Sequence, residues 1–306
     1  MSFILLIISL AIVIKSADFA IHYSTRLAES FRLSKYVVGF LIVAVISILP
    51  EMFIAVTSAI EGVPSFGLGM LFGSNVADLT LVFAMVVLIA GRSLKVESKI
   101  IKNRYLHIGI MSLPILFGLN GYYSRWEGLF LIVLGLAFYY YIFKNDAYDI
   151  DAPREKFKYT DLILLLISMG MLLLGSHFTV KFGVNFANYI NFSPVLLGMF
   201  VVGLSTTLPE LMFSVRAAKH NYDGLALGDI LGTVVADATI IVGIIAIISP
   251  FAFNPQIVYV AGMFMLFGTV LLFHLMKTGK VLTKKEALSL IVFYLLFVSA
   301  ELLINK

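Results

Sequence analysis

A stretch between residues 15 and 80 recurs without a gap 159 positions later in the chain, and each copy carries acids inside apolar segments. Within residues 15–80, Glu51 matches Glu210, and Asp78 matches Asp237. Four further matched pairs are Pro50/Pro209, Gly39/Gly198, Gly69/Gly228 and Gly73/Gly232. A carboxylate at membrane depth costs about 2.5–3.5 kcal/mol on insertion scales. Four acids at matched positions therefore indicate a function, whereas a single Asp could be a structural hydrogen-bonding group.

The composition places the chain in a membrane. It is 60% hydrophobic and 13% charged, whereas about a quarter of the residues of a soluble domain are charged. Residues 3–14 resemble the core of a signal peptide, but no basic region precedes them and the apolar run continues through Ala20, which favours a retained first helix. The absence of cysteine excludes disulfides and thiolate metal sites. We expect the lipid bilayer as a partner, no nucleic acid, and a chain that works as a monomer.

Ten segments are apolar enough to be candidate spans, since a span needs about 20 residues. They are 2–21, 36–60, 66–91, 106–120, 127–143, 160–180, 194–218, 224–249, 254–276 and 286–303. Five spans per half is an odd number, so the second copy enters the membrane the opposite way round. The predicted fold class is an all-α membrane protein with ten transmembrane helices in two inverted five-helix repeats. The predicted units are a first repeat (1–143), a cytoplasmic linker (144–159) and a second repeat (160–306).

The basic residues orient this arrangement. With the N-terminus outside, inner loops and segment ends hold 18 of the 22 Lys and Arg residues. Only Arg125, Lys181 and Lys306 lie outside, and Lys15 falls within the first span. This distribution follows the positive-inside rule. The sequence therefore predicts a multi-pass protein of the cell membrane with the N-terminus and the C-terminus outside.

Each of the four acids has a hydroxyl residue four positions before it. The pairs are Ser47/Glu51, Ser74/Asp78, Thr206/Glu210 and Thr233/Asp237, and Thr207 adds a hydroxyl three positions before Glu210. Residues four apart share one face of a helix. Pro50 and Pro209 interrupt their helices because proline lacks an N–H group, and a bound cation can satisfy the carbonyl that this frees. The glycine pairs of each copy predict close helix packing near the acids.

Carboxylate, hydroxyl and carbonyl oxygens without Cys or His suit hard cations such as Ca²⁺, Na⁺, Mg²⁺ or Mn²⁺. We expect no cofactor and no enzymatic activity, because no nucleophile or metal-hydrolase motif accompanies the acids. A cation channel is a more distant alternative. Asp229 is either a peripheral ligand or a helix-surface group. Lys15 and Asp18 could pair with each other.

At these residues the chain resembles the cation/Ca²⁺ exchanger superfamily, and most closely its prokaryotic Na⁺/Ca²⁺ exchangers. The motif segments are Ile46–Glu51 and Ser205–Glu210, followed by Gly73–Asp78 and Gly232–Asp237. The resemblance implies a secondary antiporter that exchanges Ca²⁺ for Na⁺ by alternating access, with the first and sixth helices sliding as a gate. It also implies that Glu51 and Glu210 are central ligands, completed by Asp78 and Asp237. The implied oxygen donors are the side chains of Ser47, Ser74, Thr206, Thr207 and Thr233 and the backbone of Ala44 and Gly203.

The chain departs from the family motif in ways that bear on the coupling ion. Ile48 stands where the motif has a hydroxyl residue, and Asp78 stands where prokaryotic members commonly have Asn. The first change removes an oxygen from one sodium position, and the second adds a charge that could carry a proton. An H⁺-coupled exchanger of Ca²⁺, Mg²⁺ or Mn²⁺ with the same fold is therefore the alternative function.

Overall fold

The structure is a computed structural model, and it describes residues 2–60, 62, 64–146, 158–189, 207–256 and 258–304. The described part is mostly helical. Its α-helices are α1 (Ser2–Phe31), α2 (Lys35–Val38), α3 (Ala44–Ser47), α4 (Leu49–Ile60), α5 (Pro64–Ala77), α6 (Phe83–Ala90), α7 (Ser98–Lys102), α8 (Arg104–Gly118), α9 (Arg125–Asp146), α10 (Tyr159–Tyr189), α12 (Leu208–Lys219), α13 (Asp223–Ala236), α14 (Val242–Ile248), α15 (Met263–Lys277) and α16 (Lys284–Ile304). Four short π-helices lie within the longer helical runs: η1 (Gly39–Val43), η2 (Asp78–Val82), η4 (Asp237–Ile241) and η5 (Val258–Gly262).

Each of the ten predicted segments contains a helix, although the seventh is described only from residue 207. Within the described residues, six helical runs are long and apolar enough to cross a membrane: Ile7–Phe31, Gly67–Ala90, Arg125–Asp146, Asp223–Ile248, Val258–Lys277 and Lys284–Leu303. Lys35–Ser47 and Tyr159–Gly175 are shorter apolar helices. The chain is therefore a multi-pass integral membrane protein, and the count of ten spans remains a prediction.

The boundaries predicted for the first helix were too short. α1 continues ten residues beyond Ile21 to Phe31, because no helix breaker interrupts it and because Arg26 forms an ion pair with Asp161 at 3.3 Å. The helix ends where Arg32 takes a left-handed conformation with φ 52°. The predicted linker at 144–159 is described only at its ends, where α9 finishes at Asp146 and α10 begins at Tyr159.

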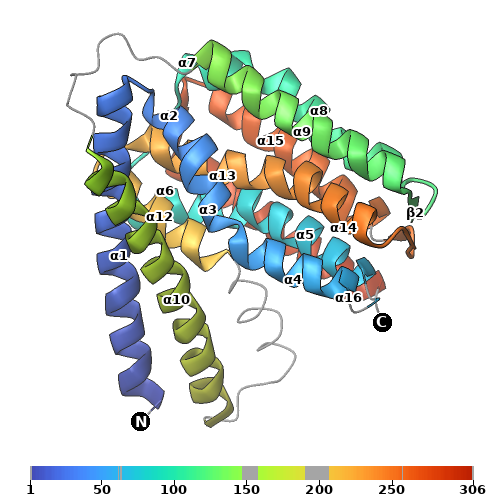
Figure 1. Ribbon diagram of the computed structural model, residues 1–306, viewed down its shortest axis with the longest axis horizontal. Helices are drawn as coiled ribbons and strands as arrows, with labels where there is room; N and C mark the ends of the chain where they lie inside the picture. The colour runs from blue at the N-terminus through green and yellow to red at the C-terminus, as the bar shows by residue number, and fades with distance from the viewer. Residues whose placement is uncertain are drawn as a thin grey trace.

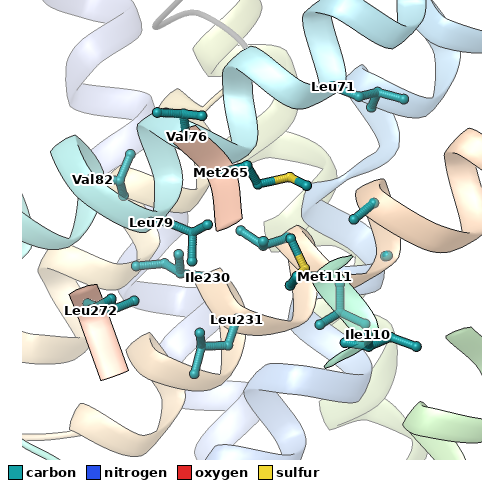
Figure 2. Packing of buried hydrophobic residues seen from close by; sticks show 14 of the residues in the cluster. Leu71, Val76, Leu79, Val82, Ile110, Met111, Ile230, Leu231, Met265 and Leu272 are labelled. Atoms are coloured by element: carbon teal, nitrogen blue, oxygen red, sulfur yellow. The ribbon is translucent and has the colours of Figure 1, made fainter. Parts of the chain in front are cut away.

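Two hydrophobic cores hold the helices together. The larger one is built from α5, η2, α8, α13 and α15, and Figure 2 shows its side chains meeting between these helices, among them Leu79, Met111, Ile230 and Met265. The smaller core joins α1 and α10 to α12 and α13. In Figure 1, α1 and α10 lie side by side along the left of the molecule, and they pack against each other over much of their length.

Asp18 attaches α1 to α12. Its carboxylate accepts a hydrogen bond from Arg216 Nε at 2.6 Å, and His220 Nε2 lies 3.6 Å away. The pairing of Asp18 with Lys15 that the sequence suggested is therefore wrong. A partner three positions away on the same helix is displaced by an arginine that tertiary packing brings from a position 198 residues away.

Several local structures recur at the spacing of 159. At the start of α9, the Ser124 N–H donates to Glu127 Oε2 at 2.7 Å and the Glu127 N–H donates to Ser124 Oγ at 3.3 Å. At the start of α16, the Thr283 N–H donates to Glu286 Oε2 at 2.8 Å and the Glu286 N–H donates to Thr283 Oγ1 at 3.3 Å. These are matching capping boxes, which fix where a helix begins. Two-stranded sheets also correspond: β1 (Leu94–Lys95) pairs with β4 (Val281–Leu282), and β2 (Tyr122–Tyr123) pairs with β3 (Phe251–Ala252).

The two small sheets lie at opposite ends of α9. This helix begins at Arg125, directly after β2, and ends at Asp146, whose carbonyl accepts a hydrogen bond from Lys99 of α7 at 3.2 Å. α7 directly follows β1 in the chain. Each sheet pairs a strand from the first half with a strand from the second half, so both ends of the bundle contain both copies.

Candidate cation site

The four matched acids are all buried at the junctions between helical segments. Glu51 lies in the first turn of α4 and Glu210 in the first turn of α12, while Asp78 and Asp237 are the first residues of the π-helices η2 and η4. None is more than 1% exposed. A helix N-terminus carries partial positive charge that favours a carboxylate, and π-bulges occur frequently at functional sites.

The helix of the first copy breaks beside Glu51 in the way that Pro50 predicts. α3 ends at Ser47, Ile48 has ψ −4°, and α4 begins at Leu49. Met52 N–H then donates to Ile48 O at 2.9 Å, so the backbone resumes a regular ladder one residue after Glu51. In the second copy, α12 begins at Leu208 with a proline in its first turn. Both glutamates therefore lie at helix starts.

Helix packing brings the acids of both copies together. α4 and α5 pack against η4, and α13 packs against η2. Glu51 interacts electrostatically with Asp78, Glu210 and Asp237. Among the described residues, no three carboxylate, His or Cys side chains converge closely enough to hold a metal ion by themselves. A cation site here would also need hydroxyl and carbonyl oxygens.

Several carboxylate oxygens at this junction are buried without a hydrogen bond from another described residue. They are both oxygens of Glu210, both oxygens of Asp237 and Oδ1 of Asp78. Burying an ionised carboxylate without compensation costs several kcal/mol or more. These groups therefore require cations or protons, and they have the chemistry that binds hard cations.

The predicted hydroxyl donors that the structure describes are buried, and the hydrogen bonds of Ser47 and Ser74 are not the ones that the helical spacing suggests. Ser47 is fully buried and donates to Asp229 Oδ1 at 3.0 Å. Ser74 donates to the carbonyl of Leu71 at 3.1 Å. Thr233 lies 3.4 Å from Ser47, oxygen to oxygen. Thr207 is buried at the N-cap of α12.

Of the three remaining predicted ligands, the structure describes Ala44 but not Thr206 or Gly203. The carbonyl of Ala44 accepts hydrogen bonds from Ile48 N–H at 3.1 Å and from Ser47 Oγ at 3.2 Å. Thr206 and Gly203 lie outside the described residues. The first-copy part of the predicted ligand set is thus placed completely, and the second-copy part only from Thr207 onward.

Two further polar residues lie in this buried region. The sequence suggested that Asn75 could line the cavity and that Asp229 is either a peripheral ligand or a helix-surface group, and the second alternative for Asp229 is wrong because the residue is buried. Asp229 is fully buried and lies within hydrogen-bond distance of Ser47. Asn75 is fully buried, its amide nitrogen is 3.6 Å from Met265 Sδ, and its carbonyl oxygen has no hydrogen bond from another described residue. The signal for Asp229 was its position four residues before Thr233, which places both on one face of α13.

Glycine allows α13 to cross α2, η1 and α3 at backbone contact. A Cβ atom at Gly228 would lie 2.2 Å from Tyr36 O, and one at Gly232 would lie 2.6 Å from Phe40 O. The predicted close approach is confirmed at these two positions. At Gly69 and Gly73, their matches in the first copy, an added Cβ would meet nothing within 4 Å among the described residues. The matched partner of the segment around Gly39 falls at residues that the structure does not describe.

Comparison with known proteins places this arrangement in a family. The family model for sodium/calcium exchanger protein matches residues 1–144 and 160–303. The chain is 21% identical to the sodium/calcium exchanger MaX1 of Methanosarcina acetivorans, with 97% of each chain covered. It is 29% identical to the putative antiporter CaxA of Alkalimonas amylolytica, with 81% of each chain covered.

The fold is also that of a solved exchanger. The sodium-calcium exchanger NCX_Mj, in a structure soaked with zero Na⁺ and Ca²⁺, superposes with a TM-score of 0.85 at 21% identity, covering 97% of this chain and 98% of that one. The resemblance seen in the two acid-bearing motifs is therefore confirmed over nearly the whole length. The chain belongs to the sodium/calcium exchanger protein family, whose members are membrane ion transporters.

Proposed function

We propose that this protein is a secondary active antiporter that exchanges Ca²⁺ for Na⁺ at a single buried site between its two copies. The observation that carries the proposal is the set of carboxylates of Asp78, Glu210 and Asp237, which are buried with oxygens that no other described residue satisfies. Ca²⁺ and Na⁺ are hard cations that bind such oxygens. The membership of the chain in the sodium/calcium exchanger family supports the choice of ions.

The site residues are proposed in four roles. Glu51 and Glu210 are the central ligands, and Asp78 and Asp237 complete the charge. The hydroxyls of Ser47, Ser74, Thr206, Thr207 and Thr233 and the carbonyls of Ala44 and Gly203 supply neutral oxygens. Four neighbouring carboxylates cannot all remain ionised without cations. The repulsion between the carboxylates makes the empty site unstable, whereas Ca²⁺ or Na⁺ stabilises it. One ion therefore leaves as the other binds, and this produces exchange.

Alternating access is proposed to use two inverted repeats of five helices each, joined by the linker at 144–159, with the termini outside. The matching capping boxes at Glu127 and Glu286 support the extent of the repeats. The small sheets at opposite ends of α9 support their inversion. The pair formed by α1 and α10, which lies along one flank and packs against α12, is the proposed moving gate (Figure 1).

Proton coupling is the second candidate, and Ile48 and Asp78 favour it. Ile48 is 5% exposed and offers no oxygen where the second copy has Thr207. Asp78 is a buried carboxylate that could carry a proton. Under this alternative the divalent ion would be Ca²⁺, Mg²⁺ or Mn²⁺.

The test is ⁴⁵Ca²⁺ uptake into proteoliposomes that contain the purified protein. Vesicles loaded with Na⁺ are compared at fixed pH with Na⁺-free vesicles that have an acidic interior. We expect uptake with the sodium gradient. Uptake only with the proton gradient would transfer the assignment to the proton-coupled candidate, and uptake with neither gradient would exclude both for Ca²⁺ and move the test to Mg²⁺ and Mn²⁺.

A further inference from the structure

Asp229 is a buried carboxylate of the second copy that has no equivalent in the first, where Met70 occupies the matching position. Its side chain is completely inaccessible to solvent. Each of its oxygens accepts one hydroxyl: Oδ1 from Ser47 at 3.0 Å and Oδ2 from Ser214 at 3.2 Å. Asp229 therefore joins α13 both to α12 and to the segment that ends beside Glu51.

The contact with Ser47 depends on the glycine crossing of α13. Gly228 precedes Asp229, and any Cβ at position 228 would meet the backbone of Tyr36. Because the two backbones touch there, a short side chain such as Asp reaches across to the end of α3. The contact between Asp229 and Ser47 is thus a product of helix packing, and not of spacing along one helix.

The two copies differ in the number of oxygen-bearing side chains near the first motif, around Ser47. The position that holds Thr207 in the second copy holds Ile48 in the first, so the Ser47 side has one hydroxyl fewer. The same side has one buried carboxylate more, since Asp229 contacts Ser47. Asp229 accepts hydrogen bonds from Ser47 and Ser214, and only Ser47 is among the proposed ligands.

Ser47 has one hydroxyl proton and three possible acceptors. These are the carbonyl of Ala44 at 3.2 Å, the hydroxyl of Thr233 at 3.4 Å and Asp229 at 3.0 Å. A carboxylate is the strongest of these acceptors and is also the nearest. With the proton held by Asp229, the lone pairs of Ser47 and the carbonyl of Ala44 are left to face a cation.

We propose that Asp229 is a positioning residue that orients the Ser47 hydroxyl and thereby strengthens Na⁺ binding on the Ile48 side of the site. The inference rests on the proposed function. Na⁺ depends on neutral oxygens such as that of Ser47, whereas Ca²⁺ is held chiefly by the carboxylates of Glu51 and Glu210. Asp229 compensates in this way for the hydroxyl that Ile48 lacks.

The test measures sodium-driven ⁴⁵Ca²⁺ uptake in proteoliposomes as a function of Na⁺ concentration and, separately, of Ca²⁺ concentration. Asp229→Asn keeps the size of the side chain and replaces the carboxylate with an amide, which is a weaker acceptor for the Ser47 proton and can itself donate to Ser47 Oγ. We expect the Na⁺ concentration for half-maximal uptake to rise about tenfold, which corresponds to about 1.4 kcal/mol. The Ca²⁺ concentration for half-maximal uptake should change by less than about threefold, because the carboxylate ligands remain.

Two further variants separate positioning from structural support. Ser214→Ala removes the other hydroxyl that contacts Asp229 but leaves the contact with Ser47, so it should leave the Na⁺ dependence near that of the wild type. Ser47→Ala should raise the Na⁺ requirement, and the double variant Ser47→Ala/Asp229→Asn should behave like Ser47→Ala alone, because Asp229 acts through Ser47. If Asp229 only tied α12 to α13, Ser214→Ala and Asp229→Asn would lower the maximal rate equally and leave both half-maximal concentrations unchanged.

The outcomes distinguish this inference from the proposed function. A wild-type protein without sodium-driven uptake would overturn the proposed function and the sodium role of Asp229 together. A wild-type exchanger whose Asp229→Asn variant keeps the wild-type Na⁺ dependence would overturn the inference about Asp229 alone. Size-exclusion chromatography establishes that each variant is folded, and Asp229→Ser takes the place of Asp229→Asn if the latter is not.

Discussion

Glu210 is one of the two proposed central ligands of the site. It is fully buried, and neither of its carboxylate oxygens receives a hydrogen bond from another described residue. Replacing it with Gln keeps the shape and removes the charge. We expect Glu210→Gln to reduce Ca²⁺ uptake about 100-fold, since the loss of one charged ligand costs about 3 kcal/mol. Glu97→Gln, at a partly exposed acid beside α7, is the matched control and should transport normally. Near-normal uptake by Glu210→Gln would remove the central claim.

We expect Ile48 to limit sodium binding. It is 5% exposed and belongs to the larger hydrophobic core, and a missing polar ligand in a site without water is not cheaply replaced. Ile48→Ser restores a hydroxyl at the place where the second copy has Thr207. We expect the Na⁺ concentration for half-maximal uptake to fall severalfold, while Ile48→Val, which adds no oxygen, should leave it unchanged. If both variants respond to Na⁺ as the wild type does, the site is built around another coupling ion.

Among the helices, α13 affects the geometry of the site most directly, because it crosses α2 and η1 at backbone contact. At Gly228 a methyl group would lie 2.2 Å from Tyr36 O, against backbone that cannot move aside without displacing the helix. Overpacking of this kind typically costs about 1–3 kcal/mol. We expect Gly228→Ala to lower the thermal midpoint and to weaken transport. Gly109→Ala in α8, where an added Cβ meets nothing within 4 Å among the described residues, is the control and should be neutral or slightly stabilising. Fluorescence-detected size-exclusion chromatography after heating measures the thermal midpoint of both variants, and ⁴⁵Ca²⁺ uptake measures their transport.

The orientation of the two copies is a property of the whole molecule. The repeat matches position 119 with position 278. Position 119 lies in the loop between α8 and α9, and position 278 lies in the loop between α15 and α16. If the copies are inverted, these loops face opposite sides of the membrane. The chain has no native cysteine, so single cysteines report their own location. We expect Asn120→Cys to react with a membrane-impermeant maleimide in intact cells and Thr278→Cys to react only after permeabilisation. Labelling of both from one side would contradict the inverted arrangement.

Much of this protein could be read from its sequence. The apolar segments predicted helices, and a helix is present in each of the ten. The matched acids predicted buried carboxylates, and all four are buried. The exchanger family followed from the motifs around Glu51 and Glu210. These properties are local or repeat within the chain, because hydropathy over about 20 residues sets a helix in lipid and because a duplicated motif keeps its spacing.

The contacts between residues of different helices could be known only from the packed structure. Spacing suggested that Asp18 would pair with Lys15, whereas packing brings Arg216 to it. Gly69 and Gly228 match in the repeat, yet only Gly228 lies against another backbone among the described residues. The sequence left Asp229 as either a peripheral ligand or a helix-surface group, and only the crossing of α13 shows that it is buried against Ser47. Such contacts depend on the angle and distance at which helices cross, and positions along a single helix do not contain that information.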